Sequence, residues 1–133
     1  MTGGKHPTLA EIAAVQLAQL RSLVAELFPA NSFYSQKLEA AGVNFDITSL
    51  EDFSTRFPLT TKQELVDDQR RHPPYGTNLT YPLSNYTRCH QTSGTSGTPL
   101  RWLDTPESWD WMVESWTKIF NAAEVERGDR IYF

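Results

Sequence analysis

The chain has 133 residues, of which 39% are hydrophobic and 21% charged, and its formal net charge is -4. This length suits one small domain or a part of a larger one, and the acidic balance does not favour a nucleic-acid-binding protein. No apolar run approaches the roughly 18 residues that cross a membrane, and the N-terminus lacks the apolar stretch of a secretion signal. The single cysteine, Cys89, excludes an internal disulfide and is typical of a reducing compartment. We therefore expect a cytoplasmic protein without nucleic-acid or membrane partners.

The sequence begins with a strong helix signal. Thr8 and Glu11 have the spacing of a capping box, which predicts a helix that begins at Leu9. Apolar residues then recur in steps of three and four, and Pro29 ends the pattern. These steps place the apolar side chains on one stripe, so we expect the helix to pack against its own domain.

Three shorter helices are predicted next. The first covers "FYSQKLEAA" after a capping Asn31 or Ser32, and the second runs from about Leu50 to the residues before Pro58. The third is expected over Lys62–Arg71, because its first turn repeats the capping-box pattern. The following stretch, "HPPYGTNLTYPLSN", is dense in Pro, Gly and Asn and predicts a loop.

The pattern changes from Tyr86 onward. "YTRCHQ" and "LRWL" are typical of two short strands joined by a long hairpin loop. Thr105 then predicts a helix cap with Pro106 at the first helical position. The final "RIYF" predicts another strand. The predicted fold class is therefore α/β, with helices followed by strands and a helix.

The last predicted helix has an aromatic face. One face carries residues at helical spacing, namely Trp109, Met112, Trp116, Ile119 and Ala123. A tryptophan-rich face of this kind is more often part of a hydrophobic core than of a ligand site, so we expect it to be buried.

The loop between the two strands carries the most informative chemistry. Gly94 and Gly97 accept positive φ, so successive backbone N–H groups can point towards one site and form an anion-binding nest. Pro99 stiffens the exit of this loop. Hydroxyl donors would surround the nest from Thr92, Ser93, Thr95, Ser96 and Thr98. Segment 92–99 therefore predicts a site for the phosphates of a nucleotide, and the alternative is a plain flexible linker.

Two side chains before the loop are further candidates. Arg88 and His90 alternate along the strand and so share one face, either beside a substrate or nucleotide pocket or as a structural pair. Cys89 points to the opposite face and is expected to be a core thiol. Asp67 and Asp68 are expected to be solvated. No His, Cys or Asp cluster has metal-ligand spacing, so we predict no metal site. No Ser–His–Asp arrangement is evident either, so we predict no catalytic residue in this chain.

These residues carry a family resemblance. "QTSGTSGTP" resembles the S-[ST]-G-T-[ST]-G-x-P phosphate loop of the adenylate-forming ligases, a superfamily that includes the acyl-CoA synthetases. "FYSQKLEAAGV" and "SLEDFSTRFPLTTKQEL" resemble stretches of phenylacetate–CoA ligases, and Arg88 and His90 keep the Arg-x-His spacing of that family before the loop. Together the stretches cover most of positions 30–133. The order and spacing make the resemblance specific to phenylacetate–CoA-ligase-like proteins.

The resemblance implies a two-step reaction in a complete enzyme. A small carboxylic acid, such as an aryl acetate, attacks the α-phosphorus of ATP, and coenzyme A then displaces AMP. Segment 92–99 would hold the β- and γ-phosphates, with Mg²⁺ bridging their oxygens. Relatives often carry Lys beside the loop proline, whereas this chain has Thr98 there, and the nearest cation in sequence is Arg101.

The resemblance also implies a domain division. Residues 1–85 would form a mainly helical N-terminal region, and residues 86–133 would begin the α/β nucleotide-binding core. We expect the chain to be an N-terminal part of the ligase, inactive alone and prone to self-association through its apolar surface. The alternative is a non-catalytic nucleotide-binding or protein-interaction module.

Overall fold

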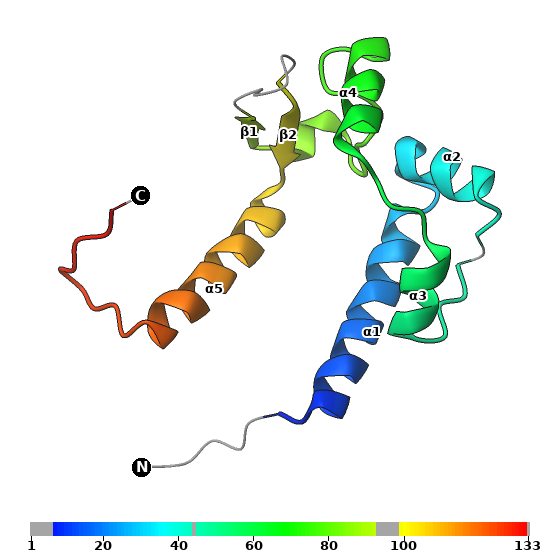
Figure 1. Cartoon of the computed structure of the whole chain (residues 1–133). Coiled ribbons are helices and arrows are strands. Elements are labelled where there is room, and N and C mark those ends of the chain that lie inside the picture. The colour runs from blue at the N-terminus through cyan, green and yellow to red at the C-terminus, as the bar shows by residue number, and fades with distance from the viewer. Residues whose placement is uncertain (1–6, 44, 93–98, 133) are drawn as a thin grey trace.

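A computed structural model describes residues 7–43, 45–92 and 99–132 of the chain. Helices form most of it, and one antiparallel hairpin lies between the fourth and fifth helices (Figure 1). The elements in chain order are α1 Leu9–Leu27, α2 Ser32–Ala40, α3 Leu50–Arg56, α4 Lys62–Arg71, the 3-10 turn η1 Leu83–Asn85, β1 Arg88–Gln91, β2 Arg101–Asp104 and α5 Pro106–Ala122. The predicted order of helices, strands and a helix is confirmed. None of the helices among the described residues is long and apolar enough to cross a membrane.

The helices begin where their capping residues predict. In α1 the side chain of Thr8 accepts the backbone N–H of Glu11, and the Glu11 carboxylate accepts the backbone N–H of Thr8. Thr61 opens α4 with the same reciprocal arrangement, and Thr105 caps α5 with Pro106 in its first turn. These side chains satisfy N–H groups that a helix leaves without an internal partner. The local sequence therefore determines the helix starts.

Long-range polar contacts join the first helices to the loop after α4. Asn31, which caps α2, is only 2% exposed, and its side-chain amide donates to Asn78 Oδ1 at 3.0 Å and Thr80 Oγ1 at 3.2 Å. Lys37 of α2 binds Glu64 of α4 at 2.5 Å. Since both contacts bridge segments distant in sequence, they hold α2, α4 and the loop together.

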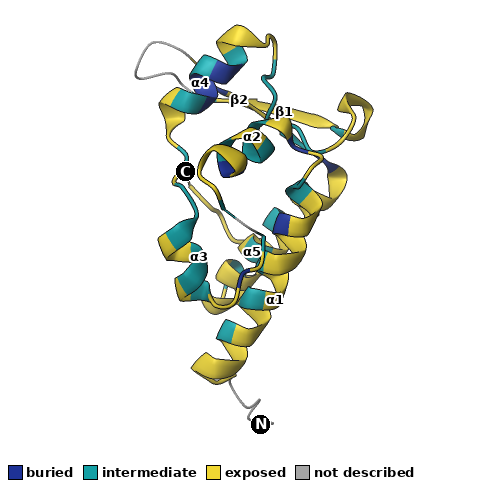
Figure 2. Cartoon of the chain, turned by 90° about the vertical axis from the view of Figure 1, so that its right-hand side faces the viewer, coloured by how far each residue is buried: buried dark blue, intermediate teal, exposed yellow. Residues whose placement is uncertain are grey.

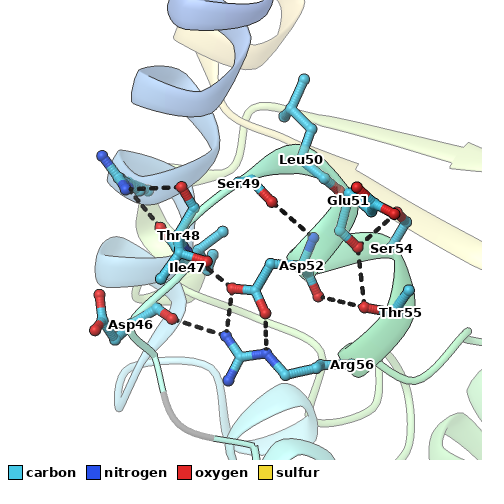
Figure 3. A network of polar contacts seen from close by, with 11 residues as sticks. Asp46, Ile47, Thr48, Ser49, Leu50, Glu51, Asp52, Ser54, Thr55 and Arg56 are labelled. Carbon is cyan, nitrogen blue, oxygen red and sulfur yellow. Dashed lines mark hydrogen bonds and ion pairs between the residues drawn. The ribbon is translucent and has the colours of Figure 1, made fainter.

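The segment before α3 forms a compact polar network (Figure 3). The Asp52 carboxylate accepts the backbone N–H of Thr48 at 2.8 Å and pairs with Arg56 at 2.5 Å. The Thr48 N–H, followed by the Arg56 guanidinium, holds the pKa of Asp52 below its ordinary value. Arg21 reaches across from α1 and donates to the carbonyl of Ile47 at 2.7 Å. This network fixes α3 against α1.

The hydrophobic core is small and lies among the first helices and the start of β2. One cluster joins Leu65 and Val66 of α4 to Leu100, with Phe33 packed against it. Ile47 is 1% exposed and is the most buried apolar side chain among the described residues. In Figure 2 most of the ribbon is yellow, which marks exposed residues, and the dark blue buried positions include short parts of α1, α2 and α4.

The structure corrects the prediction for the tryptophan-rich face of α5. None of the described side chains of α5 is buried, and Trp116 and Ile119 are 44% and 54% exposed. The predicted terminal strand is also absent, because Arg130–Tyr132 has no strand pairing and Phe133 lies outside the described residues. The only sheet among the described residues is the β1–β2 pair, and no neighbouring edge pairs with residues 130–132. A strand needs such a partner for its backbone groups.

Two single-residue expectations are also wrong. Asp68 is not solvated: it is 3% exposed, and its carboxylate accepts the backbone N–H of Thr77 at 2.6 Å and the hydroxyl of the same residue at 2.8 Å. Asp68 thereby ties the loop after α4 back to the helix. Cys89 is exposed and not a core thiol, and the described residues form no second sheet that could cover the two-stranded hairpin. The predicted loop also contains the short turn η1.

Candidate phosphate-binding site

The hairpin fixes the two ends of the glycine-rich segment. β1 and β2 pair in register from Arg88 opposite Asp104 to Gln91 opposite Arg101. Beyond that pair, the backbone N–H of Thr92 donates to the carbonyl of Leu100 at 3.0 Å, and the N–H of Leu100 donates to Thr92 Oγ1 at 3.0 Å. The strands therefore bring positions 92 and 100 together. Six predicted site residues lie outside the described residues, namely Ser93, Gly94, Thr95, Ser96, Gly97 and Thr98.

A cleft of about 670 Å³ adjoins the described end of this segment. It lies between α4 and the start of β2, and Pro99 forms part of its wall. Its charged lining residues are Lys62, Arg70 and Arg101, and none of the described residues that line it carries a carboxylate. A concave surface with positive charge is suited to an anion, because it concentrates potential where the ligand binds. We call it the basic cleft.

Two-way hydrogen bonding between α4 and β2 positions the basic cleft. The side-chain amide of Gln69 donates to the carbonyl of Arg101 at 2.7 Å, and its oxygen accepts the Arg101 N–H at 3.1 Å. The Arg101 guanidinium also donates to the carbonyl of Pro74 at 3.0 Å. Arg70, the residue after Gln69 in α4, forms an ion pair with Asp67. These contacts hold the wall of the cleft in place beside Pro99.

Arg88 and His90 lie together on one face of the hairpin, as their spacing predicts. The guanidinium of Arg88 lies 4.5 Å from the ring centre of Trp109, and the His90 ring stacks on that indole at 5.2 Å with an interplanar angle of 6°. His90 Nε2 lies 3.4 Å from Asp104 Oδ2, and the other oxygen of that carboxylate, Oδ1, accepts the Ser108 hydroxyl. Both candidates are exposed and preoriented by the first turns of α5. Whether they contact a ligand stays a prediction.

Sequence reasoning missed the contribution of α4 to this site. Gln69 and Arg101 are 32 positions apart, and no local motif links them. Arg70 lies in the last turn of α4, where positive charge suits the helix dipole, and it also lines the basic cleft. Trp109 was assigned to a core face, whereas it supports Arg88 and His90. Only the folded arrangement brings these residues together.

Comparison with curated proteins gives consistent relatives. The chain is 34% identical over 90 residues to the phenylacetate-coenzyme A ligase of Escherichia coli (strain K12) and 36% identical over 90 residues to that of Thermus thermophilus. Each match covers 67% of this chain and 19% of the relative. The chain thus spans about a fifth of the length of the curated relatives it matches. No family model matches the chain.

Solved structures agree with the sequence comparison. A crystal structure of an open conformation of 2-hydroxyisobutyryl-CoA ligase, in complex with 2-HIB-AMP and CoA, matches 91% of this chain with a TM-score of 0.82 and 29% identity. That match covers 28% of the solved chain. A second structure of this ligase, in the postadenylation state with 2-HIB-AMP, matches equally well.

The fold and the sequence together therefore place this chain among the adenylate-forming CoA ligases. Its curated relatives are phenylacetate–CoA ligases, as the motifs around positions 33–65 and 88–99 predict. The matched relatives are acid–thiol ligases by name, which agrees with the enzyme class that the resemblance indicates.

Proposed function

We propose that this chain is the phosphate-binding part of an ATP-dependent carboxylate–CoA ligase of the phenylacetate–CoA ligase type. In the complete enzyme a small carboxylic acid, ATP and coenzyme A would be the substrates. Residues 1–85 would supply a helical platform, and residues 86–133 would begin the nucleotide-binding core. The chain alone is expected to be inactive.

The basic cleft beside Pro99 is the observation that best supports this proposal. A nucleotide carries a polyphosphate of high negative charge, and three cationic side chains line a cleft that adjoins segment 92–99. A volume of about 670 Å³ lies within the usual range of small-molecule sites. If segment 92–99 were a plain linker, cationic side chains would not be expected to gather beside its C-terminal end.

The roles of the residues follow from their chemistry. The hydroxyl of Thr92, and those of Ser93, Thr95, Ser96 and Thr98, would donate to phosphate oxygens together with the backbone amides of Gly94 and Gly97. Arg101 would supply the charge that relatives place next to the loop proline. The Arg101 guanidinium already donates to the carbonyl of Pro74, so its charge is held close to one position. A flexible lysine beside the loop proline is then not needed to supply that charge.

The described residues also bear on the metal. They contain no group of three His, Cys, Asp or Glu side chains that could hold a metal ion. Mg²⁺ binds nucleotide sites mainly through phosphate oxygens and water, with few protein ligands. We therefore infer that Mg²⁺ would accompany ATP and neutralise part of its charge.

Isothermal titration with Mg-ATP tests the proposal. We expect the Ser93→Ala/Thr95→Ala variant and the Arg101→Gln variant each to weaken binding at least about tenfold, since each removes donors from phosphate. A Ser84→Ala/Thr87→Ala variant removes two exposed hydroxyls from the preceding loop and should bind as the original chain does. Equal affinity for all four proteins, or no binding by the original chain, would contradict the proposal.

A further inference from the structure

The helices α1 and α5 extend away from the hairpin end of the molecule (Figure 1). Side chains from both helices and from β2 line an apolar groove. Its volume is about 790 Å³, and its apolar walls include Leu20, Leu23 and Leu27 from α1 and Trp102, Leu103 and Trp111 from the opposite side. We call it the α1/α5 groove. Trp111 is 70% exposed and Leu23 is 51% exposed, so the described residues leave much of this apolar surface open to water.

α5 presents a second apolar surface on its other side. Trp109, Met112, Val113, Trp116 and Phe120 line a separate concavity of about 420 Å³. Trp109 and Trp111 are two positions apart, which is about 200° of rotation around the helix. A helix with apolar surface on opposite sides is typical of the interior of a larger domain.

The charges of the α1/α5 groove indicate what it would accept. Its charged lining residues are Glu26, Asp104 and Glu107, and no basic side chain is among its described lining residues. Tyr81 donates its hydroxyl to Glu26, and this hydrogen bond raises the pKa of Tyr81 to about 12, so the tyrosine stays neutral near neutral pH. An apolar segment with a lysine or arginine beside it would match both the walls and the rim.

The comparison with solved ligases indicates where the occupant of the groove would come from. The solved 2-hydroxyisobutyryl-CoA ligase matches 91% of this chain with a TM-score of 0.82, so the arrangement of the helices resembles that of part of the solved chain. The matched part is 28% of that ligase chain, which therefore contains much further polypeptide. In a much larger chain, other segments can pack into the space between the two helices. The shared arrangement is expected if they do.

We propose that the α1/α5 groove and the tryptophan-rich side of α5 together form a docking surface for the polypeptide that corresponds to the unmatched part of a CoA ligase. This inference rests on the proposed function, because it takes the ligase relatives as the source of the partner. It adds a partner and an interface to the nucleotide site. In isolation the same apolar surface would cause weak self-association, which the docked polypeptide would replace.

The test uses the whole 133-residue chain, co-expressed with E. coli phenylacetate-coenzyme A ligase from which the region matched by this chain has been removed. We expect the two to co-purify as a 1:1 complex by light scattering, and the purified truncated ligase to dissolve oligomers of the chain. Trp111→Gln and Leu23→Gln, on opposite walls of the groove, should each weaken the complex at least about tenfold. Glu39→Gln, an exposed change on α2 outside both apolar surfaces, should leave it unchanged.

Several results would overturn the docking surface. They are failure of the two polypeptides to associate, persistence of oligomers of the chain beside an equimolar truncated ligase, and a complex insensitive to both groove variants. Circular dichroism checks that the variants keep their helices, which we expect because both changed side chains are largely exposed. Mg-ATP titration of the chain alone separates the two proposals: loop-dependent binding without docking rejects only this inference, whereas docking without loop-dependent binding rejects the nucleotide site.

Discussion

The helical region, Leu9–Thr80, and the hairpin region, Tyr86–Tyr132, use their polar and apolar side chains differently. In the helical region Asn31 and Asp68 are buried and make specific hydrogen bonds to other segments. In the hairpin region Arg88, His90 and the tryptophans of α5 are at or near the surface. The helical region is therefore stabilised by contacts among its own segments. The hairpin region instead exposes side chains that are suited to binding a ligand or a partner.

The two regions meet where the proposed chemistry lies. α4 belongs to the helical region, yet its Gln69 holds Arg101 of β2 through two hydrogen bonds. Leu100 packs into the cluster of Leu65 and Val66. The strand that follows segment 92–99 is thus anchored on the helical region. This arrangement can keep a phosphate-binding loop in place while the rest of the hairpin region stays available to partners.

The largest difference between the regions is expected in core truncations. Ile47→Ala removes a side chain that is 1% exposed and should lower the free energy of unfolding by about 3 kcal/mol, through lost burial and a cavity. Trp111→Gln in the hairpin region should change it by less than about 0.5 kcal/mol, since that side chain is largely exposed. Urea unfolding followed by circular dichroism measures both. Equal losses would remove the contrast between the regions.

A smaller loss is expected from a buried polar group. Asp68→Ala leaves the backbone N–H and the hydroxyl of Thr77 without their acceptor, which should cost about 2 kcal/mol. The neighbouring Asp67→Ala removes an exposed ion pair with Arg70 and should cost less than about 1 kcal/mol. The same unfolding experiment compares the two variants. A larger effect at Asp67 would show that the burial of Asp68 does not stabilise the helical region.

Loss of the Thr105 cap of α5 should have a smaller effect, in the hairpin region. Thr105→Ala removes the side-chain acceptor of the Ser108 N–H at the start of α5 and should lower stability by about 1 kcal/mol. Thr105→Ser keeps the hydroxyl and should restore most of that loss. If α5 unfolds separately, helical signal will be lost at a lower urea concentration than the rest. No difference between the alanine and serine variants would show that the cap does not stabilise α5.

The smallest expected effect is a pH dependence in the helical region. Hydrogen bonding by Lys37, and then by the Thr61 backbone N–H, lowers the pKa of Glu64 from 4.5 to about 2. A lowered pKa in the folded state means that this contribution is present above pH 4.5 and is lost as the pH falls towards 2. The free energy of unfolding, measured across that pH range, should therefore depend less steeply on pH in Glu64→Gln than in the original chain. Glu114→Gln on α5 is the control, and identical slopes for the original chain and Glu64→Gln would contradict the assignment.

Local sequence signals predicted most elements because they depend on neighbouring residues. The spacing of Thr8 and Glu11, and the Thr105–Pro106 pair, marked helix starts that the structure confirms. The burial of the α5 face and the strand at residues 130–132 were predicted wrongly, since both depend on what lies alongside them in space. Patterns of period 3.6 or 2 show that a face is apolar but not what covers it.

The candidate site, like the fold, has parts that the sequence could predict and parts that it could not. Segment 92–99 could be proposed from its composition and its resemblance to a family motif, because its glycines and hydroxyls are contiguous in sequence, and its role stays a prediction. The basic cleft was not, since Lys62 and Arg70 reach Pro99 and Arg101 only through the fold. The support of Arg88 and His90 by Trp109 likewise requires α5 to turn back onto β1. Contacts between distant segments set the parts of the site that sequence reasoning missed.

The most direct test of the central claim observes the amide groups of segment 92–99 during addition of Mg-ATP. In ¹⁵N-edited NMR spectra we expect large, saturable shifts of the Gly94 and Gly97 amide signals, with smaller shifts at Arg101. The same titration of Arg101→Gln should require a higher nucleotide concentration. If the two glycine signals stay unmoved while nucleotide is in excess, segment 92–99 does not bind phosphate, and the account is contradicted.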